Sequence, residues 1–250
     1  MAKRPNTRKT REHIHHENEG ENNVRSLFGW SPLGNDEEER RDQRFLRHVK
    51  PRSDGQENLM KAIDNSPLIV AIGPAGTGKT YLAVSKAVEA LESGQVSRII
   101  LSRPAVEAGE SLGYLPGHVE DKLGPYLRPL LDALSDRLSP KRLKMLMSEG
   151  IIEIAPVGFM RGRTLNNAFV VIDEAQNCTY GQLKMLLTRL GWNSTMVVTG
   201  DPHQTDLLPE MSGLAQIANQ LEKVEDIAVV RLEAKDIVRH PLVASMLKVL

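Results

Sequence analysis

Eight consecutive residues match a pattern that binds phosphate groups. They are Gly73-Pro74-Ala75-Gly76-Thr77-Gly78-Lys79-Thr80, which fit G-x-x-x-x-G-K-[ST]. Glycines in such a loop let backbone N–H groups turn inward, where they and the positive end of a following helix meet the β and γ phosphates of a nucleotide. We predict that Lys79 reaches these phosphates and that the hydroxyl of Thr80 binds the accompanying Mg²⁺. Tyr81, the next residue, belongs to the same predicted nucleotide-binding set.

The residues on either side supply the elements that this pattern requires. Leu68 to Ile72 is a short run of branched apolar residues, typical of a buried parallel strand, and residues 81–93 have helical spacing. A glycine-rich turn without a ligand is the alternative. The order strand, glycine loop, helix favours phosphate binding.

A second apolar strand, Phe169 to Ile172, ends in two carboxylates. We predict that Asp173 holds the Mg²⁺ through water and that Glu174 orients or deprotonates the attacking water. A strand followed by ordinary acidic loop residues is the alternative, which the upstream phosphate loop disfavours. Gln176 is a candidate for linking the nucleotide to the rest of the site.

Two polar residues further along the chain are predicted to complete the chemistry. Gln204 follows the buried strand 195–200 and is predicted to bond the γ phosphate and report its presence, although a plain turn would have a similar sequence. Arg239 lies on a loop between a strand and the last helix, and is a candidate for the cation that stabilises the transition state.

Three other arginines are candidates for contact with nucleic acid or with a neighbouring subunit. Arg103 opens a long glycine- and proline-containing loop after the strand 98–102, where ligands of open α/β sheets bind. Arg161 and Arg163 lie between glycines after the strand 151–155. They suit phosphate contact or serve only as exposed solubilising charge, and the sequence leaves both interpretations open.

Composition limits the remaining possibilities. The 250 residues suffice for one α/β domain with tails, and the 32 basic and 32 acidic side chains supply no global attraction to nucleic acid. Aromatic residues make up 4% of the chain, fewer than expected of a protein that binds single strands mainly by stacking. The only cysteine, Cys178, is predicted to be a small buried side chain, and no apolar run is long enough to span a membrane. A cytoplasmic location is the default expectation.

The chain is predicted to consist of two parts. Residues 1–50 are densely charged and poor in apolar positions, as in a flexible N-terminal extension. Residues 51–250 have the composition of a folded domain.

Taken together, the motifs of residues 51–250 resemble the PhoH-like ATPases. The resemblance rests on Gly73 to Thr80 and on Arg103-Pro104, Glu107-Ala108-Gly109-Glu110, Gly113-Tyr114-Leu115-Pro116-Gly117, Arg161-Gly162-Arg163-Thr164, Asp173-Glu174-Ala175-Gln176-Asn177, Gly200-Asp201-Pro202-His203-Gln204-Thr205-Asp206 and Arg239-His240-Pro241-Leu242-Val243. It implies a RecA-like P-loop NTPase, with a mostly parallel sheet flanked by helices, similar to the first motor domain of superfamily-one helicases. It also implies Mg²⁺-dependent ATP hydrolysis, a ring, as in a hexamer, and a link to RNA metabolism, ribonucleases and phosphate starvation.

The resemblance adds two expectations about the site. Gln56 lies 17 positions before Gly73, where a glutamine of RecA-like motor ATPases reads the adenine edge, although it could instead be an ordinary polar residue in the first turn of a helix over 56–65. Helicases hold ATP between two such cores and this chain has one, so Arg239, or Arg161 and Arg163, is expected to enter a neighbouring subunit's site.

Two functions from different classes remain open at this point. The favoured hypothesis is an oligomeric ATPase that moves along or remodels RNA or single-stranded DNA. The alternative is a nucleotide-dependent switch or adaptor that recruits a ribonuclease or another partner and does little mechanical work.

Overall fold

The computed structural model describes residues 49–104, 119–208, 211–238 and 246. Residues 1–48 of the predicted N-terminal extension, most of the loop after Arg103, and Arg239 lie outside the described residues.

Helices and strands alternate along the described chain, as an α/β fold requires. The order is α2 (Asp54–Asn65), β1 (Leu68–Ile72), α3 (Lys79–Glu92), β2 (Arg98–Arg103), α4 (Val119–Ser135), α5 (Pro140–Ser148), β3 (Ile152–Pro156), the 3₁₀ helix η2 (Val157–Met160), β4 (Ala168–Ile172), the 3₁₀ helix η3 (Ala175–Asn177), α6 (Tyr180–Leu187), β5 (Thr195–Gly200), α7 (Leu214–Leu221), β6 (Ile227–Arg231) and the 3₁₀ helix η5 (Ala234–Asp236).

The strands form one six-stranded sheet in the order β3-β2-β4-β5-β1-β6. Every neighbouring pair is parallel. All carboxyl ends therefore meet at one edge of the sheet, and this edge collects the loops after β1, β4 and β5. The prediction of a mostly parallel α/β sheet is confirmed.

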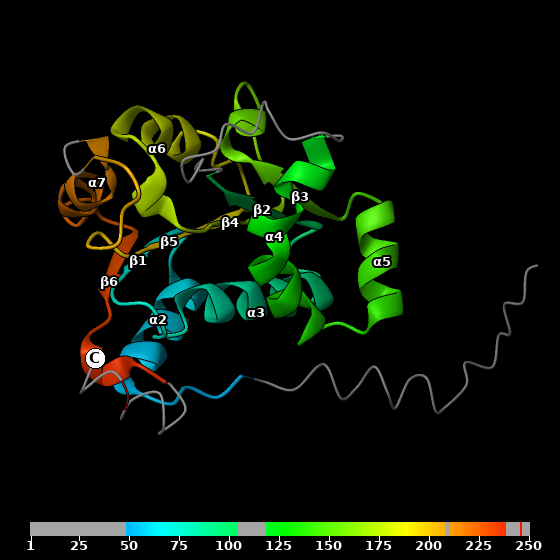
Figure 1. Cartoon of the computed structure of the whole chain (residues 1–250). Helices are drawn as coiled ribbons and strands as arrows, with labels where there is room; N and C mark the ends of the chain where they lie inside the picture. The colour runs from blue at the N-terminus through cyan, green and yellow to red at the C-terminus, as the bar shows by residue number, and fades with distance from the viewer. Residues whose placement is uncertain (1–48, 105–118, 209–210, 239–245, 247–250) are drawn as a thin grey trace, which may run out of the picture.

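Helices cover both faces of the sheet, as Figure 1 shows, with α2 and α3 on one side and α6 and α7 on the other. Strand β1 illustrates why its sequence is apolar throughout. Ile69 and Ala71 pack into the core with α2, α3, α4 and α5, whereas Leu68, Val70 and Ile72 pack into the core with α6 and α7. Successive side chains of a strand point to opposite faces, so a strand covered on both faces has no polar side.

Most predicted elements appear in place, and the differences have local causes. Ser139 caps α5 by accepting a hydrogen bond from the backbone N–H of Arg142, with Pro140 at the first helical position. The spacing of Leu183, Leu186, Leu187 and Leu190 predicts a helix over about 179–190, and this prediction is wrong at its end because α6 stops at Leu187. The next residues leave the helix to pair with Leu165, whose N–H donates to Arg189 O at 2.9 Å.

No helix in the described part of the chain combines the length and the apolar character that crossing a membrane needs.

Candidate nucleotide-binding site

A cavity of about 270 Å³ lies at the carboxyl edge of the sheet, where the loops after β1, β4 and β5 converge. The residues that line it come mainly from the predicted motifs, and they are Ala75, Gly76, Gly78, Lys79, Thr80, Tyr81, Asp173, Glu174, Gly200, Asp201 and Gln204. The fold thus brings the glycine loop, the acidic strand end and Gln204 to one place. Their chemical roles stay predictions.

The glycine loop has a backbone that other residues rarely adopt. Gly73, Gly76 and Gly78 have φ values of 151°, 84° and 84°. At Gly73 an added Cβ would lie 2.4 Å from the carbonyl oxygen of Leu232. The loop is also tied to its surroundings, because Val238 N donates to Gly76 O at 2.9 Å. Conformation therefore favours glycine at all three positions, and at Gly73 the lack of space favours it as well.

Lys79, the first residue of α3, is buried beneath this loop. Its ammonium donates to Gly73 O at 2.6 Å and to Pro74 O at 2.8 Å, and it lies 3.4 Å from Thr77 Oγ1. Burial lowers the pKa of Lys79, and the charges of the carboxylates across the cavity only partly oppose this shift. In the described part of the chain its hydrogen-bond acceptors are neutral oxygens, so no carboxylate there is hydrogen-bonded to the cation, which suits an anionic ligand.

Asp173 lies at the end of β4 and is 2% exposed. Its Oδ1 accepts hydrogen bonds from Thr80 Oγ1 at 2.6 Å and Thr199 Oγ1 at 2.7 Å. A carboxylate beside a hydroxyl fits a hard cation such as Mg²⁺, which takes one or two protein oxygens and keeps several waters. Thr80 and Asp173 therefore form a donor set that fits the predicted metal.

Glu174 follows with a left-handed backbone (φ 52°, ψ 40°), which a glutamate adopts at a cost of about 1 kcal/mol. Two groups hold its carboxylate. Gln176 Nε2 donates to Oε2, and Arg103 Nη2 lies 3.4 Å from Oε1. Arg103 Nη1 also lies 3.8 Å from Asp173 Oδ2. The structure therefore places Arg103 against the acidic pair of its own chain, while its contact with nucleic acid or a neighbouring subunit stays a prediction.

Gln176, 3% exposed, connects two loops of the site. Its Oε1 accepts from Asp201 N at 3.0 Å while its Nε2 reaches Glu174. Its backbone carbonyl also accepts from Thr205 Oγ1 at 3.0 Å and from Ser212 Oγ at 2.8 Å. Gln176 therefore joins the loop after β4 to the loop after β5, and its predicted link to a nucleotide stays a prediction.

The two glutamines predicted to contact nucleotide lie in different surroundings. Gln204 is exposed and lines the cavity, and its backbone N–H donates to Asp201 O at 3.0 Å. Gln56 is buried behind the glycine loop, where its Nε2 donates to Thr77 O at 3.0 Å and its Oε1 accepts from Arg52 N at 2.9 Å. Gln56 thus supports the loop from behind, and its recognition of adenine stays a prediction.

The structure separates the two arginines that follow β3. Arg163 forms a two-pronged ion pair with Glu153, with N–O distances of 2.5 and 2.6 Å. Hydrogen bonds from this guanidinium lower the pKa of Glu153. Arg161 is exposed. Neither residue lines the cavity, and β2 lies between β3 and β4 in the sheet.

Cys178 is fully buried among apolar residues of the α6 and α7 face, as predicted. Burial raises the pKa of its thiol to about 12, so the thiol stays protonated at neutral pH.

A glycine loop between a parallel strand and a helix, facing the acidic end of another strand, defines the class of P-loop NTPase folds. The large terminase of a thermophilic bacteriophage has a similar fold, with a TM-score of 0.50 and 12% identity over 80% of this chain and 50% of the terminase chain. The family model for PhoH-like proteins matches residues 48–250. The chain belongs to the PhoH-like family.

Relatives from distant bacteria agree with this assignment. The chain is 54% identical over 199 residues to a PhoH-like protein of Mycobacterium tuberculosis H37Rv, covering 79% of this chain and 56% of the relative. It is 53% identical over 201 residues to a PhoH-like protein of Bacillus subtilis 168, covering 80% and 63%. It is 41% identical over 244 residues to Protein PhoH of Escherichia coli K12, covering 96% and 68%. The chain therefore spans just over half the length of its mycobacterial relatives.

Proposed function

We propose that this protein binds ATP in the glycine-loop cavity, hydrolyses it with Mg²⁺, and works as a ring-forming motor on RNA or single-stranded DNA. The observation that carries the proposal is the convergence of Lys79, Asp173 and Glu174 on one cavity at the carboxyl edge of the sheet. A buried cation without a carboxylate hydrogen-bonded to it, facing two carboxylates, is the arrangement that phosphate transfer to water requires.

Each of these residues has a defined task in the proposed reaction. Lys79 exchanges the carbonyls of Gly73 and Pro74 for phosphate oxygens, which are better acceptors because they are charged. Thr80 and Asp173 are the residues that would hold Mg²⁺, whose charge offsets that of the phosphates when it is bound. Glu174 accepts the proton of the attacking water, in an orientation set by Gln176 and Arg103.

A ring supplies what the single core lacks. Transition-state charge in phosphate transfer is commonly stabilised by an arginine. Arg103 is a poor choice for this role because its guanidinium already lies against Asp173 and Glu174. Arg163 is a poor choice because Glu153 holds its guanidinium. We therefore propose that Arg239 or Arg161 of a neighbouring subunit enters the site. A ribonuclease partner, the link to RNA metabolism and phosphate starvation, and a cytoplasmic location rest on the family resemblance alone.

The test is the steady-state ATPase rate with and without single-stranded RNA and DNA. We expect Glu174→Gln to lower turnover by about 10²- to 10³-fold with ATP affinity retained, because it removes the proton acceptor but keeps the shape. Glu149→Gln, at an exposed position after α5, is the matched control and should behave as the wild type.

Three results would change the proposal. Wild-type hydrolysis in the Glu174→Gln variant would remove Glu174 from the reaction. No measurable ATP binding would exclude the ATPase. Hydrolysis that nucleic acid does not stimulate would favour the nucleotide-dependent switch over the motor.

A further inference from the structure

An aromatic side chain stands out from the surface just after β3. Phe159, on the 3₁₀ helix η2, is 64% exposed. Full burial of a phenylalanine side chain stabilises a fold by about 1.5–3 kcal/mol, and a ring left this exposed gains only part of that. The ring is therefore free to contact a ligand or a partner.

The exposure of Phe159 does not come from a frayed segment. Its neighbours Val157 and Met160 are buried in the core on the α6 side of the sheet. The following residues are also fixed. The N–H of Arg163 donates to Met160 O at 3.4 Å, and its guanidinium forms a bidentate ion pair with Glu153. The ring is thus carried on an anchored turn, which limits the conformational entropy lost when it is covered.

The surroundings of this turn are positively charged. Arg163 and Glu153 cancel each other, which leaves Arg161, an exposed residue two positions after Phe159. Arg189 adds a second charge that no carboxylate among the described residues pairs, because its guanidinium donates there to Met185 O at 3.2 Å, Arg163 O at 3.1 Å and Thr188 Oγ1 at 3.2 Å, which are neutral acceptors. This local charge suits a polyanion, although the whole chain is neutral.

The turn also lies at the functional edge of the sheet. Because η2 begins directly after the carboxyl end of β3, Phe159 lies near the edge that carries the nucleotide cavity. Only β2 separates β3 from β4, so the two strand ends are about 10 Å apart at the usual strand spacing. An extended ligand that crosses this edge would reach both the turn and the loops of the cavity.

We propose that η2 is a contact site for single-stranded nucleic acid, in which Phe159 stacks on a base and Arg161 binds a neighbouring phosphate. Base stacking on an exposed ring beside a guanidinium is how proteins hold single strands without reading their sequence. The scarcity of aromatics in this chain fits one stacking position, with the remaining contacts made to the backbone. This inference rests on the proposed action on RNA or single-stranded DNA.

The test measures the affinity of fluorescent single-stranded uridine and thymidine oligonucleotides for the full chain, with a non-hydrolysable ATP analogue present. Phe159→Leu removes the ring and keeps an apolar side chain, and we expect it to weaken binding about tenfold. Phe159→Trp should bind at least as tightly as the wild type. Arg161→Gln should reduce the slope of log affinity against log salt by about 1.

Two matched controls lie on the opposite, amino-terminal edge of the sheet. Trp192, 85% exposed before β5, and Lys223, exposed after α7, should tolerate Trp192→Leu and Lys223→Gln without change in affinity. An abasic oligonucleotide sharpens the assignment. Phe159→Leu should no longer matter for this probe, whereas Arg161→Gln should still weaken its binding.

The outcomes separate this inference from the proposed function. If the wild type binds neither RNA nor DNA strands, the proposed action on nucleic acid fails and this site fails with it. If the wild type binds and Phe159→Leu binds equally well, only the site is overturned. If Phe159→Leu changes the oligomeric mass in sedimentation and leaves strand affinity unchanged, the turn is a subunit contact and the inference is likewise overturned.

Discussion

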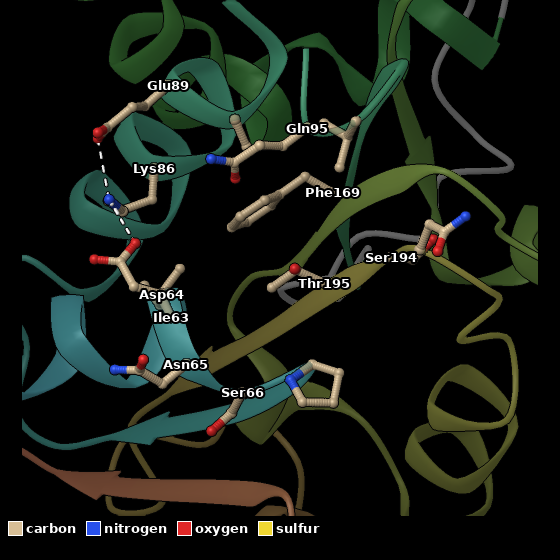
Figure 2. Close-up of a pocket in the computed structure, with 14 residues that line it drawn as sticks. Ile63, Asp64, Asn65, Ser66, Lys86, Glu89, Gln95, Phe169, Ser194 and Thr195 are labelled. Carbon is tan, nitrogen blue, oxygen red and sulfur yellow. Dashed lines mark hydrogen bonds and ion pairs between the residues drawn. The ribbon is translucent and has the colours of Figure 1, made fainter. Parts of the chain in front are cut away.

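The two edges of the sheet hold two lysines of the same helix in opposite environments. At the carboxyl edge, Lys79 donates only to neutral oxygens, and burial lowers its pKa. About two turns further along α3, Lys86 lies between Asp64 at 2.7 Å and Glu89 at 3.1 Å, as Figure 2 shows. Burial alone would lower the pKa of Lys86, but the hydrogen bonds to Asp64 and Glu89 and the attraction of their charges together outweigh burial and raise that pKa.

The comparison teaches that an unbalanced charge identifies the site better than the size of a cavity does. The cavity beside Lys86 has a volume of about 620 Å³, more than twice that of the cavity beside Lys79. Its cation is nevertheless already neutralised by its own chain, whereas Lys79 keeps a charge that a phosphate could neutralise. Substitutions at the two edges should therefore have different consequences.

The largest effect is expected at Lys79. Lys79→Met should lower ATP turnover by about 10³-fold or more and weaken ATP binding, because it removes the phosphate-binding cation. Its melting temperature should not fall, since a buried charge is replaced by an apolar chain of similar length. Turnover assays and thermal unfolding check both points, and turnover within tenfold of the wild type would refute the assigned role of Lys79.

A smaller effect is expected from Gln176→Leu, which cuts the link between the loops after β4 and β5. Turnover should fall by about 10- to 100-fold as Glu174 loses its orientation. Stability should fall by about 1–2 kcal/mol, because Asp201 N loses its acceptor. Gln95→Leu, beside the larger cavity, is the matched control and should keep full turnover. Equal turnover in the two variants would show that the link is only structural.

At the amino edge, Lys86→Met should leave turnover within twofold of the wild type. Urea denaturation should show that the free energy of unfolding falls by about 1 kcal/mol. The loss is small because the carboxylates of Asp64 and Glu89 are partly exposed, so that solvent and salt screen both ion pairs. The folded pKa of Lys86 is raised, so its contribution is complete below the unfolded pKa of about 10.4 and disappears as pH rises through the folded value. A large loss of ATPase activity in a folded Lys86→Met protein would show that both lysines, and so both edges of the sheet, are needed for turnover.

The smallest effect concerns Cys178, a buried titratable group near the carboxyl edge to which we assign no chemistry. Its thiol pKa is about 12 in the folded protein, whereas an unfolded thiol ionises near 8.5. Between pH 9 and 10 the unfolded chain therefore loses this proton first, and the wild type should lose about 1 kcal/mol more stability than Cys178→Ala. If the free energy of unfolding, measured by urea denaturation at these pH values, falls equally with pH in the two proteins, the thiol pKa is not raised by burial.

The parts of the site that could be predicted are those encoded by neighbouring residues. The glycine loop and the strand that ends in Asp173 and Glu174 are local patterns, because each needs only an apolar run followed by a short motif. The burial of Cys178 was also predicted, because no histidine stands next to it in the sequence to make it a reactive thiolate. These elements appear where their spacing indicated.

The parts that could not be predicted are contacts that depend on how the chain folds in three dimensions. Arg103 meets Asp173 and Glu174 because β2 lies beside β4, and nothing near Arg103 in the sequence specifies that neighbour. Arg163 likewise looked equivalent to Arg161 until the pair with Glu153 separated them. The contact of Arg103 depends on the strand order and that of Arg163 on the path of the turn after β3, and local spacing specifies neither.

The crowding at Gly73 has a consequence for inhibitor design. An added Cβ would meet a backbone oxygen of Leu232, which cannot swing aside as a flexible side chain could. Drug-resistance mutations commonly arise where a changed side chain blocks a compound and spares the target. If a compound binds through the backbone at Gly73, substitution of Gly73 should not give resistance, because any larger residue there would also disrupt the protein.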